Sequence, residues 1–194
     1  MKTLLCRLGL VIALVVAVVA PASAAVTISF YSHKFHYALS GVTQYPHAFV
    51  VLNGTTDDGQ AVNTNLGFSA VTPSYTLAVL GPLPGALDDV PLRSGYVAEA
   101  TFHFSFPLTD GQARAVLAAA DKWRNAPQPS YDLWSRNCVT FIRDIAIAAG
   151  LSVGGEKDNR FDPRAFLDDV AARNTAFLTQ HDDHLKSIPA ENNN

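Results

Sequence analysis

Apolar and polar residues alternate in several short segments of the first half of the chain, and this pattern predicts β-strands. The predicted strands cover residues 26–31, 47–52, 60–66, 75–80 and 96–106. A turn-forming segment, residues 53–59, separates the second strand from the third. We expect residues 81–95, which include three prolines and three glycines, to form a long loop that borders a substrate cleft.

The second half of the chain carries the start signals of helices. Thr109 and Gln112 have the spacing of a capping box, and a helix with one apolar side is expected after them. Asp162 followed by Pro163 predicts a further helix, with aspartate as the N-cap and proline in the first turn. Strands that precede helices along the chain predict an α+β fold with an antiparallel sheet.

The first 24 residues have the three-part pattern of a secretory signal peptide. Lys2 and Arg7 give a positive start, residues 8–20 are an unbroken apolar run, and small residues up to Ala24 supply the cleavage site. The alternative is a membrane anchor, but spanning a bilayer takes about 20 apolar residues and this run is shorter. We therefore expect an exported protein, periplasmic or secreted, with no membrane anchor after cleavage.

The rest of the chain is expected to form one acidic domain. Residues 25–180 suffice for a single core, and residues 181–194 are expected to be a flexible polar tail. Loss of Lys2 and Arg7 leaves 12 of the 14 basic residues against 17 acidic ones, so the formal charge moves from −3 to −5. No basic patch interleaved with aromatic residues is present, which argues against nucleic acid as a partner.

Cys138 is the only cysteine outside the predicted signal peptide, since the other of the two is Cys6. One cysteine cannot form an internal disulfide. In an oxidising compartment it is therefore buried and inert, paired between chains, or chemically active. Composition alone favours the inert interpretation.

The position of Cys138 favours a chemically active thiol. Apolar residues at helical spacing run from Cys138 to Ala149, Gly150 ends the helix, and Ser135 or Asn137 can be its N-cap. The thiol therefore lies in the first helical turn, where free backbone N–H groups and the helix dipole stabilise a thiolate. Such N–H groups can also bind an oxyanion, as nucleophilic catalysis requires.

A cysteine nucleophile needs a general base, which is usually a histidine. His47 opens an apolar strand directly after Pro46, at a sheet edge that a helix N-terminus can reach, although a hydrogen-bonded edge histidine fits the pattern equally well. The other histidines are expected to be peripheral: His33 and His36 at the surface, His103 on a solvent-facing strand position, and His181 and His184 in the tail, where their spacing alone makes no metal site.

Two short segments resemble a known superfamily. The segment HAFVVLNG, residues 47–54, resembles the histidine strand of NlpC-type papain-like cysteine peptidases. The segment YDLWSRNCVTF, residues 131–141, resembles the Asn-Cys-x-x-Phe segment of the circularly permuted branch, which includes lecithin:retinol acyltransferase-like proteins. In that branch the histidine-bearing sheet precedes the cysteine helix, as it does here. The resemblance implies a permuted papain-like fold with Cys138 as the nucleophile and His47 as the base.

The resemblance also implies a third polar residue, on the strand after the histidine strand, that orients the imidazole. Asn63 and Asn65 lie there and share one face by alternation. A hairpin centred near Thr56 would place Asn65 opposite His47, whereas counting along the motif points to Asn63. An asparagine can hold a histidine tautomer without carrying a charge.

Tyr131 and Asn137 are the candidates for substrate binding, although Tyr131 fits a core position and Asn137 a helix cap equally well. The expected function is hydrolysis of an amide bond in a peptide or cell-wall-type substrate, without metal or cofactor. One alternative is a thiol acyltransferase or lipid hydrolase with the same catalytic residues. A second alternative is a non-catalytic envelope binding protein with a buried cysteine.

Overall fold

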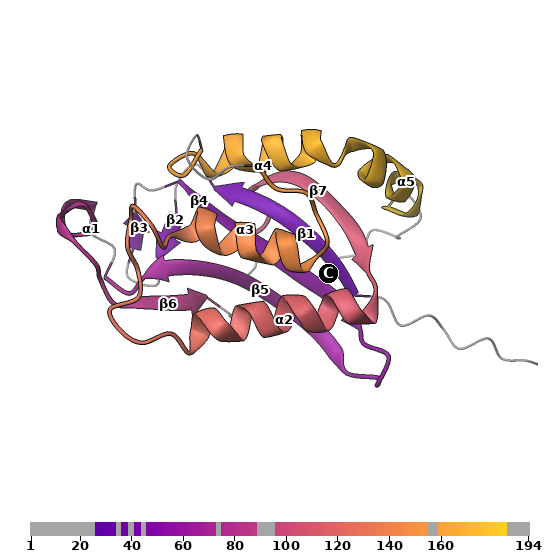
Figure 1. Cartoon of the computed structure of the whole chain (residues 1–194), viewed down its shortest axis with the longest axis horizontal. Coiled ribbons are helices and arrows are strands. Elements are labelled where there is room, and N and C mark those ends of the chain that lie inside the picture. Colours follow the sequence, from indigo (N-terminus) through magenta and orange to yellow (C-terminus); the bar gives the residue numbers. More distant parts are fainter. Residues whose placement is uncertain are drawn as a thin grey trace, which may run out of the picture.

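The computed structural model describes residues 26–33, 36–38, 41–43, 46–72, 75–88, 96–154 and 159–185. They contain a five-stranded antiparallel sheet in the order β6-β5-β4-β1-β7 (Figure 1). Its strands are β1 (Val26–His33), β4 (His47–Thr55), β5 (Ala61–Ala70), β6 (Gly85–Asp88) and β7 (Thr101–Leu108). The predicted α+β class with an antiparallel sheet is confirmed.

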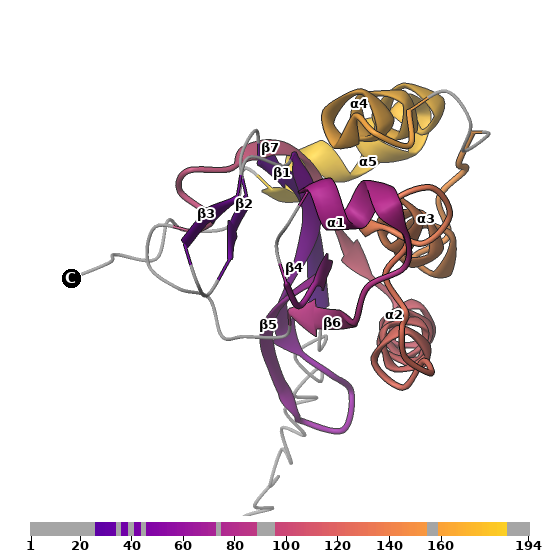
Figure 2. The same cartoon turned by 90° about the vertical axis from the view of Figure 1, so that its left-hand side faces the viewer.

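Helices cover one face of this sheet. The helices are α1 (Tyr75–Leu80), α2 (Asp110–Arg124), α3 (Cys138–Ala148), α4 (Pro163–Arg173) and α5 (Thr175–Leu185). Figure 2 shows α2, α3 and α4 on one side of the sheet, and on the other side the paired short strands β2 (His36–Ala38) and β3 (Gly41–Thr43).

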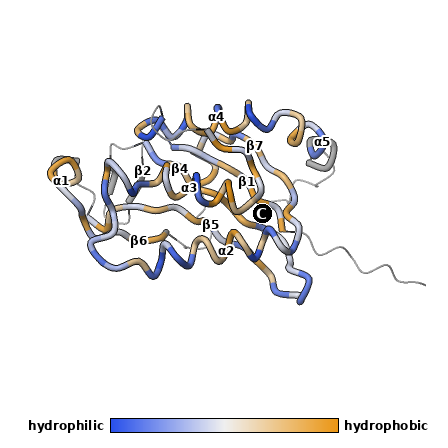
Figure 3. Tube along the Cα trace, in the orientation of Figure 1, coloured by the Kyte–Doolittle hydropathy of each residue, from blue (hydrophilic) through white to orange (hydrophobic). Residues whose placement is uncertain are grey.

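The core lies between the sheet and the helices. Ala48, Val50 and Phe68 face this core, and the rings of Phe68 and Phe141 of α3 are 6.5 Å apart. Because side chains alternate along a strand, the residues between these positions point to the opposite face. Figure 3 shows the hydrophobic stretch of α3 in front of the sheet and the hydrophilic turn between β4 and β5 at the rim of the sheet.

The opposite face of the sheet is aromatic near the start of β4. The ring of Phe49 stacks on those of Tyr31 and His33, at 5.3 Å in both cases, and Tyr96 lies 4.7 Å from Phe49. His33 is consequently 4% exposed, and burial lowers the pKa of its imidazole. The prediction that His33 is a surface residue is therefore wrong. His36 begins β2.

The predicted helix starts of α2 and α4 are confirmed. Thr109 and Gln112 form the capping box of α2. The Asp162 side chain accepts a hydrogen bond from the Ala165 amide, and Pro163 occupies the first turn of α4. These signals are local, because each cap is satisfied within four residues, and local signals survive tertiary packing.

Residues 75–80 form helix α1, so the strand predicted there is wrong. A short apolar run has no decisive period, and this one packs little, since Leu77 and Leu80 are 45% and 77% exposed. The strand predicted from residue 96 starts only at Thr101, as β7.

The segment predicted as a long loop contains the edge strand β6. Leu87 of β6 belongs to the core, and Leu83 pairs with Tyr131 through two backbone hydrogen bonds. The part of the loop at residues 89–95 lies outside the described residues. The prediction of an irregular loop is therefore wrong for residues 85–88, while the predicted role of the segment at a substrate cleft stays a prediction.

The pairing of β4 with β5 differs from the predicted one. Phe49 lies opposite Gly67 and Val51 opposite Asn65, so the hairpin is centred on Asp58 rather than on Thr56. The turn closes there because the Gly59 amide donates to the Thr56 carbonyl, with Gly59 at φ 82°. The predicted pairing of Asn65 with His47 is therefore wrong.

The predicted signal peptide, residues 1–24, lies outside the described residues. Helix α5 continues to Leu185, so the part of the predicted tail at residues 181–185 is helical. Within the ranges described above, no helix is long and apolar enough to cross a membrane.

Candidate active site

Cys138 is the first residue of α3, and Asn137 fixes the backbone that carries it. The Asn137 Oδ1 atom accepts hydrogen bonds from the amides of Val139 and Thr140, at 2.9 and 3.1 Å. The Thr140 hydroxyl accepts a hydrogen bond from the backbone amide of Asn137 at 2.8 Å, which completes a capping box. Of the two predicted N-caps, Asn137 is therefore confirmed and Ser135 is not used.

The side-chain amide of Asn137 also links two loops through hydrogen bonds. Its Nδ2 atom donates to the carbonyl oxygens of Leu133 and Arg160, at 2.9 and 3.1 Å. The loop that precedes α3 and the loop that precedes α4 therefore meet at the cap. This side chain is fully occupied by structural contacts, although it also lies in the pocket wall.

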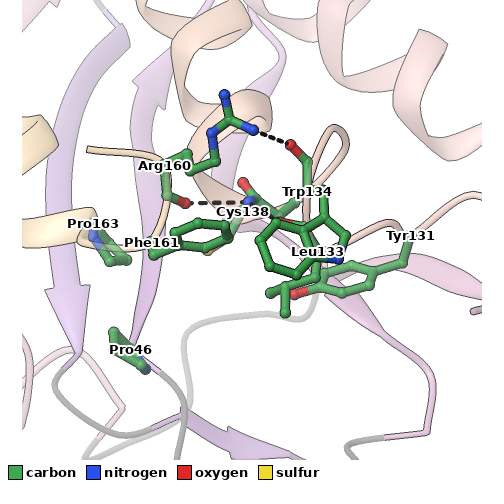
Figure 4. Close-up of a pocket in the computed structure, with 9 residues that line it drawn as sticks. Pro46, Tyr131, Leu133, Trp134, Cys138, Arg160, Phe161 and Pro163 are labelled. Carbon is green, nitrogen blue, oxygen red and sulfur yellow. Dashed lines mark hydrogen bonds between the residues drawn. The ribbon is translucent and has the colours of Figure 1, made fainter. Parts of the chain in front are cut away.

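A pocket of about 410 Å³ opens over Cys138 (Figure 4). Its lining consists mostly of apolar and aromatic side chains: Pro46, Tyr131, Leu133, Trp134, Asn137, Cys138, Arg160, Phe161 and Pro163. The structure thus brings Cys138, Asn137 and Tyr131 to one cavity, as predicted. Sequence reasoning did not select the wall that comes from residues 160–163, because that segment joins the site only through the tertiary fold.

Two aromatic rings stand at the pocket wall. The rings of Trp134 and Phe161 are 5.2 Å apart in an edge-to-face arrangement, and these residues are 51% and 49% exposed. Figure 4 shows Arg160 above them in the view, with its guanidinium directed at the Trp134 carbonyl, to which it donates at 2.9 Å. The pocket therefore offers apolar surface with a single cationic side chain beside it.

The first-turn position does not make Cys138 acidic. The residue is 8% exposed, and burial raises the pKa of its thiol to about 11. The backbone amides of Ala48, Val139 and Cys138 itself lower the pKa, but burial outweighs them. The thiol is therefore neutral at pH 7 in this structure, and the expectation that the helix start alone yields a thiolate is wrong.

His47 begins β4, but its imidazole lies on the face of the sheet away from α3. Ala48 faces the helices, so by alternation His47 points the other way, and its Nε2 atom lies over Gly67. The backbone beside it does reach the pocket, because Pro46 lines the cavity and the Ala48 amide acts on the thiol.

The two candidate asparagines lie at different distances from His47. Asn65 is 3% exposed and sits two residues from Gly67, on the face that carries the His47 ring. Asn63 pairs with Asn53 farther along the hairpin and is exposed. Of the two, Asn65 is the one near His47.

Tyr131 serves the pocket and the core together. Its backbone pairs with Leu83, and its ring stacks on Phe68 at 5.9 Å while lining the cavity. Tyr131 therefore occupies a core position and a pocket-lining position at once.

His103 is buried, so the prediction of a solvent-facing position is wrong. Its side chain is 3% exposed; its Nε2 atom lies 2.8 Å from Ser32 Oγ and its Nδ1 atom 2.9 Å from Asp168 Oδ1. A shift in the β1–β7 register between Phe30 and Tyr31 breaks the regular alternation that the prediction assumed. No sequence motif joins Ser32, His103 and Asp168, which come from three separate elements.

In the described part of the chain, no group of three or more His, Cys, Asp or Glu side chains is arranged to hold a metal ion. His181, one of the two tail histidines, packs its ring against Phe177 at 4.6 Å. No protein-family model, no curated protein and no solved structure matches this chain.

Proposed function

We propose that the protein is an exported cysteine hydrolase of the circularly permuted papain-like type, acting on an amide or peptide bond in the cell envelope. The observation that carries this proposal is the position of Cys138, at the start of α3 and in the wall of a 410 Å³ pocket. Neither feature alone implies chemistry, but an accessible cavity beside a first-turn thiol is the arrangement that acyl transfer needs.

In this mechanism the Cys138 sulfur attacks the carbonyl carbon of the substrate. The developing oxyanion accepts hydrogen bonds from the amides of Cys138 and Ala48, both of which already act on the sulfur. Collapse of the tetrahedral intermediate releases the amine and leaves a thioester, which water then hydrolyses. Because the thiol is neutral at pH 7, its proton must leave as the carbon–sulfur bond forms, which requires a base.

The resemblance assigns His47 as this base and Asn65 as its orienting residue. The proximity of Asn65 and the adjacency of His47 to Ala48 support that assignment. In the described conformation the imidazole faces away from α3, so this assignment requires the ring to turn around the start of β4 when substrate binds. Asn63 is disfavoured, because it lies at the far, exposed part of the hairpin.

The pocket wall favours a second candidate with the same nucleophile. Leu133, Trp134 and Phe161 give the cavity an apolar lining, which suits a fatty or other apolar acyl group as well as an apolar peptide side chain. We therefore keep a thiol acyltransferase or lipid hydrolase as the alternative. The two candidates differ in leaving group and acyl chain, and not in the role of the thiol.

The purified protein should release soluble fragments from cell-wall material or hydrolyse p-nitrophenyl esters, and Cys138→Ala should abolish both activities. Alanine at this buried position keeps the first turn of α3, and circular dichroism checks that the fold is intact. Equal turnover by the variant would exclude Cys138 as the nucleophile. Binding of wall fragments without release would favour the non-catalytic binding protein.

A further inference from the structure

We propose that Asp168, His103 and Ser32, in place of His47, form the array of groups that accepts the Cys138 proton, an inference that rests on the proposed hydrolase function. The three side chains are linked in a row across α4, β7 and β1, with distances of 2.9 Å from Asp168 to His103 and 2.8 Å from His103 to Ser32. Ser32 and the His103 side chain are each 3% exposed, so the row is shielded from solvent except at Asp168.

The row ends on the strand next to the residue that contacts the cysteine. Ser32 is the cross-strand partner of Ala48, and partners in an antiparallel pair carry their side chains on the same face. Ala48 faces the core below α3, and its amide acts on the Cys138 thiol. Ser32 is therefore about one cross-strand spacing, on the order of 5 Å, from the residue that the thiol contacts. His103 lies on the helix side of the sheet, through its contact with Asp168 of α4, whereas His47 lies on the other side.

The two hydrogen bonds determine the tautomer of His103 and therefore the donor and acceptor at each step of the row. The Asp168 carboxylate accepts a hydrogen bond from Nδ1–H of His103, so Nε2 carries the lone pair and accepts from the Ser32 hydroxyl. This is the tautomer that a base needs, held by a carboxylate on the far side of the ring.

The proton then moves in a balanced sequence. A water molecule between the thiol and Ser32 accepts the Cys138 proton and passes one of its own to Ser32 Oγ, while the Ser32 hydroxyl proton moves to Nε2 of His103. The sulfur electron pair forms the bond to the carbonyl carbon. On collapse, the proton held by the imidazolium returns along the same atoms to the leaving amine, whose bond to the acyl carbon breaks.

The environment of His103 keeps it neutral and ready to accept a proton. Burial lowers the pKa of the imidazole, while the hydrogen bond and charge of Asp168 raise it and the charge of Arg164 lowers it. Among the described residues, Asp168 and Arg164 of α4 are the charged groups that shift the pKa of this ring, and β1 contributes the neutral Ser32 hydroxyl. The base form is therefore present at and below pH 6.5, down to the lowered pKa.

The test is the pH dependence of Cys138 alkylation by iodoacetamide, which needs no knowledge of the substrate. The plot of the wild-type alkylation rate against pH should contain an ascending limb below pH 6.5, where the rate rises because His103 loses its proton. Both His103→Gln and Ser32→Ala should remove this limb and slow alkylation at pH 7 by about a hundredfold. Asp168→Asn should shift the limb to lower pH and slow the reaction by about tenfold.

Matched controls separate chemistry from folding. Asp169→Asn changes the neighbouring carboxylate of α4, which pairs with Arg173. Ser105→Ala removes a different buried hydroxyl, which lies on β7. Both should leave the pH profile unchanged. A purely structural role for the row would lower the urea midpoint of the His103 and Ser32 variants without moving the limb. Asp168 is 62% exposed, so its variant keeps the test valid if the others fail to fold.

The outcomes distinguish this inference from the proposed function. Wild-type profiles in His103→Gln and Ser32→Ala would overturn the array, even if Cys138 proved to be the nucleophile of a working hydrolase. A His103-dependent profile in a protein that cleaves neither amides nor esters would overturn the hydrolase and leave the array in place.

Discussion

The Nε2 atom of His47 lies 2.6 Å from the position that a Cβ atom would occupy on Gly67. Real Cβ atoms do not approach other atoms this closely, so only glycine fits beneath this imidazole. The contact is tightened from the other side by Phe49, whose Cβ lies 3.3 Å from the same position. The glycine therefore sets the place of His47 on the sheet.

We predict that Gly67→Ala displaces His47 and destabilises the fold by about 1–3 kcal/mol, because the added methyl group overpacks a buried site. Urea unfolding measures the loss, and the chemical shifts of the His47 ring report its displacement. Gly81→Ala is the matched control, since a Cβ at Gly81 meets nothing within 4 Å. Equal stability of the two variants would show that His47 moves aside without cost.

The cap of α3 leads to a second prediction. Asn137→Ala removes two accepted and two donated hydrogen bonds at a residue that is 2% exposed. We expect a loss of at least about 1–2 kcal/mol in the free energy of unfolding, the usual cost of a deleted cap. Asn137→Asp, which keeps the acceptor but loses the donors, should be intermediate. A silent alanine variant would contradict the assigned role of Asn137.

The buried thiol predicts a change in stability with pH. Its pKa is about 11 in the folded state against an ordinary value of 9.0. The unfolded chain therefore loses this proton first, and the stabilisation present below pH 9 is lost as the pH rises to about 11. The loss amounts to about 3 kcal/mol at most. Comparing urea midpoints of the wild type and Cys138→Ala across this range isolates the contribution, because the variant lacks the group.

Local signals in the sequence predicted the helix starts well. The caps at Thr109, Asn137 and Asp162 are each satisfied by amides two or three residues away, so nothing distant decides them. The short run at residues 75–80 lacked such a signal, and its strand prediction was wrong. Edge strand β6 was missed because prolines and glycines surround it, while the β5 residues that pair with it are fifteen or more positions away in the chain.

The candidate site was predictable only in part. Cys138, Asn137 and Tyr131 lie on one continuous segment, and the structure keeps them at one pocket. The environment of His103 depends on an irregular β1–β7 register and on a helix that begins sixty residues later. No pattern in the sequence reports either feature. This is why a residue expected in solvent instead has a hydrogen-bond partner on each ring nitrogen.

Deletion of residues 82–91 should abolish stable folding, because it removes the whole of β6. Gly85 of this strand also exchanges two hydrogen bonds with the Gln128 side chain, both at 2.9 Å. A gentler variant, Gln128→Ala, should lower the urea midpoint while leaving the secondary structure unchanged by circular dichroism. A deletion variant that melts like the wild type would contradict the structural role of β6 and favour the original interpretation of this segment as a loop at the substrate cleft.

Trp134→Ala should weaken the use of substrates with long apolar acyl groups and spare short ones. The exposed ring of Trp134 forms one wall of the pocket with Phe161, so its removal takes away apolar contact with the acyl chain but not with the reacting carbonyl. We expect KM for p-nitrophenyl octanoate to rise about tenfold, the equivalent of one or two buried methylene groups, with kcat and acetate hydrolysis nearly unchanged. Phe102→Ala is the matched control, because Phe102 is 52% exposed and lies outside this pocket. An equal loss on acetate and octanoate would mean that Trp134 positions the catalytic loop instead of binding the acyl chain.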